Sequence, residues 1–311
     1  MCHHDSPEQN AHSPPLGFEA PQIENMIGQG VYFALLSMLL AGVNDVVFKK
    51  YSNKERSRGM YILGIGATWA LLQLLYVTAS GANLAFDANT IKYGVTAGVL
   101  LAASNILLVE SLTRVEVSVG STIYRLNTVG VVALSIIFLQ ESAEAMKLAG
   151  ILVGVLAILL LYRGEASFSV LRTSRTFFLF AVLASLLRAL YGVISKAGLL
   201  AAAEMQSIIM IAACCWMIGG AAYARYIENR FVLTRKKITY SVVSGLLVFG
   251  IVNCLMLGLD QGEASIVIPI ANMSFVVAIF ISGVMGLEKI DLSKGLATVC
   301  AVGSIVLLAN V

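Results

Sequence analysis

Residues 118–141 read SVGSTIYRLNTVGVVALSIIFLQE, and residues 265–288 read SIVIPIANMSFVVAIFISGVMGLE. Both stretches begin with a serine, run through an apolar segment with a polar residue near its middle and end on a glutamate, 147 positions apart. The same offset relates the only two tryptophans, Trp69 and Trp216. Further pairs with this offset are Phe33 and Phe180, Tyr76 and Tyr223, Gly98 and Gly245, and Lys147 and Lys294. The chain therefore contains two copies of one unit.

The composition is that of a membrane protein. Of the 311 residues, 58% are hydrophobic and 13% are charged, whereas soluble domains carry about 25% charged residues. A spanning helix needs about 20 mostly apolar residues. Ten such segments follow one another at 28–48, 60–80, 91–111, 116–139, 144–162, 176–196, 205–224, 238–259, 264–287 and 292–310. We therefore predict an all-α membrane protein with ten transmembrane helices, arranged as two five-helix repeats at 28–163 and 175–311.

An odd number of spans in each unit means that the two copies cross the membrane in opposite directions. The basic residues support this inversion, because cytoplasmic loops retain positive charge. Sixteen of the 21 Lys and Arg residues lie on one side of the spans, and three (Lys92, Lys147 and Lys196) lie on the other. We therefore predict inverted repeats in the inner (cell) membrane, with the basic side in the cytoplasm and both termini on the outer side.

Residues 1–27 differ from the rest and are predicted to form a disordered polar tail. Residues 1–26 hold all three histidines and four of the five prolines, but no Lys or Arg. A metal site formed by Cys2, His3 and His4 is conceivable. However, no fold holds these ligands in place, so a disordered extension is the favoured interpretation and no metal or cofactor is expected.

The two quoted stretches are each followed by a Gly-rich apolar segment, AGILVGVLAILLL (149–161) and GLATVCAVGSIVLL (295–308). This succession resembles the drug/metabolite transporter superfamily, specifically its ten-helix EamA-type members, over residues 28–311. The resemblance implies a central cavity between two pseudo-symmetric halves and a contact between the Gly-rich fifth and tenth helices. Many members carry a proline in both copies of the quoted region, but here Pro269 has Thr122 as its equivalent.

Two arginines lie within the predicted spans and need a partner, since an arginine at the bilayer centre costs at least about 2.5 kcal/mol. Arg125 lies about 13 Å into its span at 1.5 Å per residue, and its repeat equivalent is Asn272. Arg188 lies near the middle of the sixth span, where its equivalent is Ala41. We predict that these two arginines and Asn272 bind an anionic group of the substrate, with Tyr124 and Tyr191 beside them.

Structural ion pairs are the alternative for both arginines: Arg125 with Glu110 or Glu116, and Arg188 with Asp45. Asp45 is also the first candidate for a carboxylate that couples transport to protons, and Glu110 is the second. Asn105 and Asn253 are equivalent with an offset of 148, and they either contact the substrate or join helices by hydrogen bonds. Trp69 and Trp216 either line the cavity or pack between helices.

The expected function is secondary transport of a small polar metabolite, anionic or zwitterionic, by alternating access. The alternative is a flippase of lipids with anionic head groups. The sequence holds no Walker A motif, no HExxH pair and no histidine in a predicted span, so ATP-driven transport and enzymatic activity are not expected. The expected partners are a small-molecule substrate and the lipid bilayer, without nucleic acid. A homodimer is left open.

Overall fold

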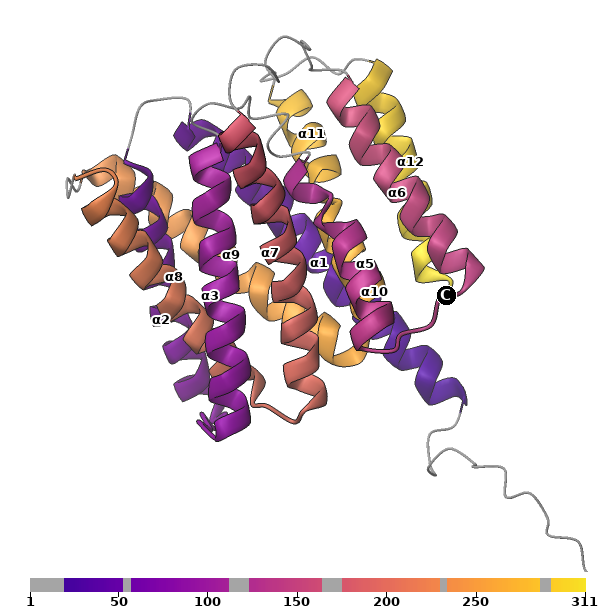
Figure 1. The fold of residues 1–311 in the computed structure, drawn as a ribbon, viewed down its shortest axis with the longest axis horizontal. Coiled ribbons are helices and arrows are strands. Elements are labelled where there is room, and N and C mark those ends of the chain that lie inside the picture. Colours follow the sequence, from indigo (N-terminus) through magenta and orange to yellow (C-terminus); the bar gives the residue numbers. More distant parts are fainter. Residues whose placement is uncertain (1–19, 53–56, 112–122, 164–174, 230–233, 286–291) are drawn as a thin grey trace, which may run out of the picture.

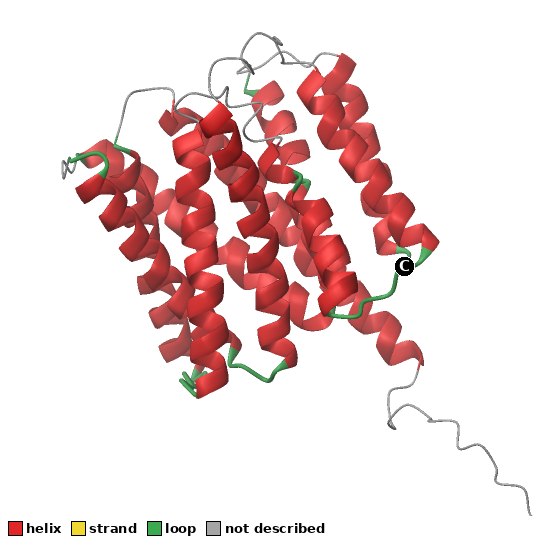
Figure 2. Ribbon diagram, viewed as in Figure 1, coloured by secondary structure: helices red, strands yellow, loops and turns green. Residues whose placement is uncertain are grey.

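The computed structural model describes residues 20–52, 57–111, 123–163, 175–229, 234–285 and 292–311. All regular structure in these residues is helical (Figure 2). The helices are α1 (Ala20–Ser52), α2 (Arg58–Ser80), α3 (Ala88–Ser111), α5 (Asn127–Phe138), α6 (Ala145–Arg163), α7 (Arg175–Leu200), α8 (Met205–Tyr226), α9 (Arg235–Gln261), α10 (Ala264–Asn272), α11 (Ser274–Val284) and α12 (Leu292–Ala309).

Within these residues, eight helices are long and apolar enough to cross a membrane. Two shorter apolar helices, Ile123–Phe138 and Ala145–Leu160, stand where the fourth and fifth spans are predicted. The chain is therefore a multi-pass helical membrane protein, and the count of ten spans stays a prediction. Helix α1 begins at Ala20, inside the predicted tail. Cys2, His3 and His4 lie outside the described residues.

Repeat-equivalent helices pack against each other in opposite directions. Helix α2 packs on α8, and α6 packs on α12 (Figure 1). A Cβ atom at Gly66 would lie 2.6 Å from the backbone nitrogen of Met217, so the α2–α8 contact depends on this glycine. In the α6–α12 pair, the Ser304 hydroxyl donates to the Gly150 carbonyl at 2.7 Å. This is the contact that the family resemblance implies for the Gly-rich helices.

The remaining packing repeats in the same symmetric way. Helix α1 of the first half packs on α9 of the second, and α7 packs on α3. Likewise α1 packs on α10 and α11, and α7 packs on α5. Each half therefore places its first helix against the third and fourth spans of the other half, which encloses the space between them.

The helices that carry the two quoted stretches are interrupted at equivalent positions. Leu126 interrupts the first, where its backbone N–H donates to the Ile123 carbonyl at 3.2 Å. Met273, 147 positions later, interrupts the second, where its N–H donates to the Ile270 carbonyl at 3.0 Å. Pro269 lies within α10, four residues before the break. The first copy breaks without a proline at the equivalent position, so the break does not depend on one.

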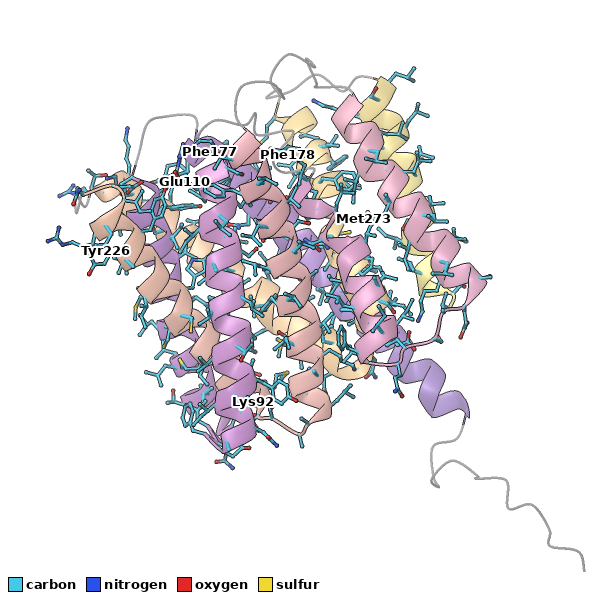
Figure 3. All side chains as sticks on the ribbon, viewed as in Figure 1. Lys92, Glu110, Phe177, Phe178, Tyr226 and Met273 are labelled. Carbon is cyan, nitrogen blue, oxygen red and sulfur yellow. The ribbon has the colours of Figure 1, made fainter. Side chains whose placement is uncertain are left out.

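The bundle has two chemically different ends. At the basic end, α1, α3, α6, α8 and α11 finish and α2, α7, α9 and α12 start. The basic residues there whose side chains are described are Lys50, Arg58, Arg225, Arg235, Lys236, Lys237 and Lys294. The opposite end carries Lys92, Lys147 and Lys196. Figure 3 shows Lys92 at the end opposite Glu110 and Tyr226. The start of α1 and the end of α12 both lie toward the Lys92 end (Figure 1).

Candidate functional site

A cavity of about 250 Å³ lies between the two halves, at the level of the two helix breaks. Helices from both halves line it, because α1 and α7 each cross to the other half. Its polar lining residues are Ser37, Asn44, Asp45, Tyr61, Asn105, Tyr124, Arg125, Arg188, Tyr191, Trp216, Asn272 and Ser274. The cavity extends toward the basic end, where Phe48, Ile62 and Leu108 complete the lining.

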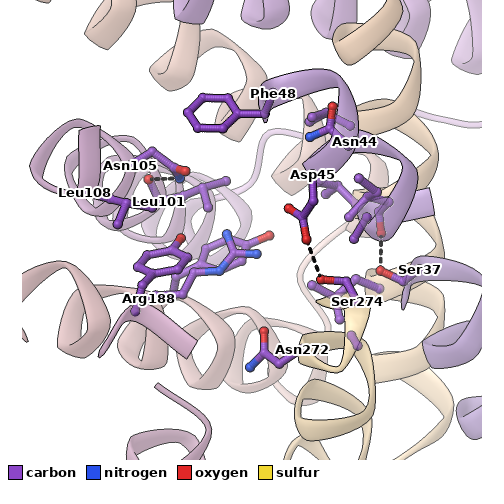
Figure 4. A pocket seen from close by; sticks show the side chains of 18 of the residues that line it. Ser37, Asn44, Asp45, Phe48, Leu101, Asn105, Leu108, Arg188, Asn272 and Ser274 are labelled. Atoms are coloured by element: carbon purple, nitrogen blue, oxygen red, sulfur yellow. Dashed lines mark hydrogen bonds between the residues drawn. The ribbon is translucent and has the colours of Figure 1, made fainter. Parts of the chain in front are cut away.

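Arg125 connects α1 to the break between α10 and α11 by hydrogen bonds and an ion pair. One guanidinium nitrogen donates to the Asn272 carbonyl at 2.8 Å and to the Ser274 hydroxyl at 2.9 Å. The other donates to Asp45 Oδ2 at 2.7 Å. The Ser274 hydroxyl donates to the same carboxylate oxygen at 3.0 Å (Figure 4). The partner of Arg125 is therefore Asp45, whereas the sequence pointed to Glu110 or Glu116. Glu116 lies outside the described residues.

The Asn272 side chain joins the two helix breaks. Its amide nitrogen donates to Asn127 Oδ1 at 2.7 Å and to the Thr128 hydroxyl at 3.0 Å. Asn127 in turn donates to the Tyr124 carbonyl at 2.8 Å, which caps the turn before α5. The interrupted helices of the two halves are thus connected by side-chain amides, and Asn272 faces the cavity beside this connection (Figure 4).

Arg188 on α7 is the cavity cation that has no acidic partner among the described residues. Among the described residues, no carboxylate oxygen lies within 4.0 Å of its guanidinium. Its guanidinium carbon lies 5.1 Å from the centre of the Tyr191 ring, within the range of a cation–π contact. Figure 4 shows Arg188 and Asn105 on one side of the cavity and Asp45 and Ser274 on the other. Because the Arg125–Asp45 pair is neutral, Arg188 leaves the described cavity with a net positive charge.

The other predicted residues separate into two groups. Asn105, Tyr124, Tyr191 and Trp216 line the cavity together with the two arginines and Asn272. Trp69, Asn253 and Glu110 are not among its lining residues.

The second group has its own contacts. Trp69 is fully buried and its ring meets that of Trp216 edge-on, with 6.1 Å between centres. Glu110 accepts a hydrogen bond from the Tyr223 hydroxyl at 2.7 Å. Asn253 donates to Gln73 at 2.9 Å. Trp69 thus has packing contacts in the interior, and Glu110 and Asn253 each have a hydrogen bond to a neighbouring helix.

Sequence reasoning missed several lining residues of α1 and α2. Ser37 donates to the Ile251 carbonyl at 3.0 Å, and Asn44 precedes Asp45 on the same helix. Phe48 and Tyr61 form a wall at the basic end, with ring centres 6.0 Å apart. Asn44 could have been predicted from the sequence, because it is a polar side chain within a predicted span. Phe48 and Tyr61 could not, because aromatic residues are common in membrane spans.

The fold and the cavity define a polytopic helical protein whose inverted halves enclose a polar central site. The sequence model of the EamA-like transporter family matches residues 28–163 and again residues 175–310. The chain belongs to this family. It is therefore a membrane transporter of small solutes, and its family consists of transporters rather than enzymes.

Solved structures support the fold. One crystal structure superposes with a TM-score of 0.74 at 13% identity, covering 91% of this chain and 95% of the other. At this identity the likeness concerns the fold alone. Among proteins with curated descriptions, none matches the chain.

Proposed function

We propose that this protein is a secondary transporter that moves a small anionic or zwitterionic metabolite by alternating access. The observation that carries the proposal concerns Arg188. Its guanidinium faces the cavity and has no carboxylate partner among the described residues. An unpaired cation in a site of low dielectric favours an anionic occupant, because a carboxylate or phosphate supplies charge-assisted hydrogen bonds.

The other cavity residues take different roles in this proposal. Asn105, Tyr124, Tyr191, Trp216 and Asn272 contact the substrate around Arg188. Arg125 contributes chiefly by holding the helix breaks to α1, since both of its terminal guanidinium nitrogens already have acceptors. Trp69 and Asn253 fall outside the binding set.

Asp45 is the better candidate for proton coupling. It lines the cavity, and its side chain is 38% exposed. Protonation would remove its charge and so weaken its bond with Arg125. Glu110 lies away from the cavity and accepts a bond from Tyr223. The measurement that decides between them is the dependence of uptake on an imposed pH gradient in Asp45→Asn and in Glu110→Gln.

Uptake by proteoliposomes tests the proposed substrate class. Purified protein is reconstituted and offered labelled organic anions, zwitterionic amino acids and organic cations of similar size, with protein-free liposomes as the control. We expect saturable uptake of an anion or a zwitterion and none of the cations. Flipping of fluorescent anionic lipids without uptake of any soluble anion would contradict the proposal and favour a flippase.

We also propose that both termini face the outside of the inner membrane. This orientation is supported by the basic end, which retains most described Lys and Arg residues and lies opposite the end of α12. An alkaline phosphatase fused after Val311 is then expected to be active, and a fluorescent protein that matures only in the cytoplasm is expected to be dark. The reverse pair of signals would overturn the orientation and leave the fold untouched.

A further inference from the structure

Within the described residues, the lining of the cavity reaches toward one end of the bundle. Its lining includes Phe48 of α1, Tyr61 of α2 and Leu108 of α3, which all lie near the basic end. Toward the opposite end, the described parts of the same core are closed, with Val77, Ile209 and Leu259 all buried. The conformation seen here therefore separates the cavity from the opposite end.

Three side-chain amides lie in this closed part. Gln73 of α2 donates to Gln206 Oε1 of α8 at 2.6 Å. Asn253 of α9 donates to Gln73 Oε1 at 2.9 Å. Gln73 is fully buried and Gln206 is 8% exposed. We call Gln73, Gln206 and Asn253 the amide cluster. It joins α2 of the first half to α8 and α9 of the second half.

The amide cluster has no symmetry-related counterpart at the equivalent positions of the repeat. Asn105 is the equivalent of Asn253, and each donates to the carbonyl four residues earlier at 2.8 Å. Asn105, however, lines the cavity. The positions equivalent to Gln73 and Gln206 are Gly220 and Gly59, which have no side chain that could form these hydrogen bonds. Of the two equivalent asparagines, Asn105 thus faces the cavity, whereas Asn253 is hydrogen-bonded to Gln73 across the interface.

We propose that the amide cluster closes the transport pathway at the end opposite the basic end, and that its two bonds break when the cavity opens there. This inference rests on the alternating access of the proposed function. Because α2 belongs to one half and α8 and α9 to the other, separating the halves at this end must break both bonds. In lipid the freed amides would lack partners, whereas in an opened aqueous pathway water replaces them. Opening is therefore coupled to hydration of the pathway.

Thiol labelling tests this proposal without any substrate. In a variant whose native cysteines are replaced by serine, Ile209→Cys reports on the closed end, because Ile209 is 1% exposed and equivalent to the cavity-lining Ile62. Leu108→Cys reports on the basic end. The protein is placed in nanodiscs, so that a water-soluble methanethiosulfonate reaches both ends, and the labelling rates are compared with and without Gln73→Leu.

We expect Gln73→Leu to raise the labelling rate at Ile209→Cys about fivefold or more, since two hydrogen bonds are lost, and to lower the rate at Leu108→Cys. Gln206→Leu removes one bond and should act in the same direction more weakly, which provides a second variant if Gln73→Leu does not fold. Thr78→Val is the matched control, because Thr78 is exposed on α2 and bonds only to carbonyls of its own helix.

An unchanged rate at Ile209→Cys would overturn the proposal. Parallel increases at both reporters would also overturn it, because local unfolding rather than an exchange of open ends gives that result. Either failure leaves the proposed substrate class standing, since that class is decided by uptake and not by labelling.

Discussion

Replacing Arg188 with alanine is expected to weaken the apparent affinity for the anionic substrate by about 10- to 100-fold, the loss of one charge-assisted contact in a desolvated site. The reason is that Arg188 is the cavity cation without an acidic partner among the described residues. Initial rates of uptake into proteoliposomes, measured over a range of substrate concentrations, give the change.

A second readout separates substrate binding from a structural role. Besides its cation–π contact with Tyr191, the Arg188 guanidinium makes no ion pair or hydrogen bond within the described residues. The thermal stability of ligand-free Arg188→Ala should therefore equal or exceed that of the unmodified protein, because a half-buried unpaired cation is removed. Lys92→Ala is the matched control, since Lys92 is an exposed cation outside the cavity. Uptake that is the same in Arg188→Ala and in Lys92→Ala would refute the assigned role.

Replacing Arg125 with alanine should instead destabilise the fold. Arg125 is 16% exposed and donates to three acceptors, and its loss leaves Asp45 without a cation. Breaking a fully buried pair costs about 3–5 kcal/mol; because Asp45 is partly exposed, we expect about 2–4 kcal/mol here. The unfolding midpoint in detergent, followed by the fluorescence of a thiol-reactive dye or by circular dichroism, should fall accordingly.

The double variant Arg125→Gln, Asp45→Asn identifies the origin of this loss. It restores a neutral, hydrogen-bonding pair at the same place, so part of the stability should return relative to Arg125→Ala. The cycle with the single variants Arg125→Gln and Asp45→Asn measures the coupling between the two side chains directly. Additive effects of the two single variants would show that the pair does not hold α1 to the helix break.

The architecture was accessible from the sequence because it depends on features that repeat or accumulate along the chain. The 147-residue offset, the ten apolar segments and the uneven placement of Lys and Arg predicted a duplicated, inverted helical membrane protein. The family match and the antiparallel packing of α2 on α8 and of α6 on α12 support that architecture. The offset also paired Arg125 with Asn272, and the structure brings these two residues into contact through the Asn272 carbonyl.

The sequence by itself thus determined the repeat, the membrane class and the helices that carry the polar centre. Only the tertiary structure decided the partners: Asp45 for Arg125, Gln73 for Asn253, and the separation of Trp216 at the cavity from Trp69 in the packed interior. The physical reason is that the sequence pattern does not fix how each helix is rotated about its own axis. Apolar patterns give the length and depth of a membrane helix, but residues at one depth point in all directions around its axis. Which of them meet depends on how α1 and α7 cross into the opposite half.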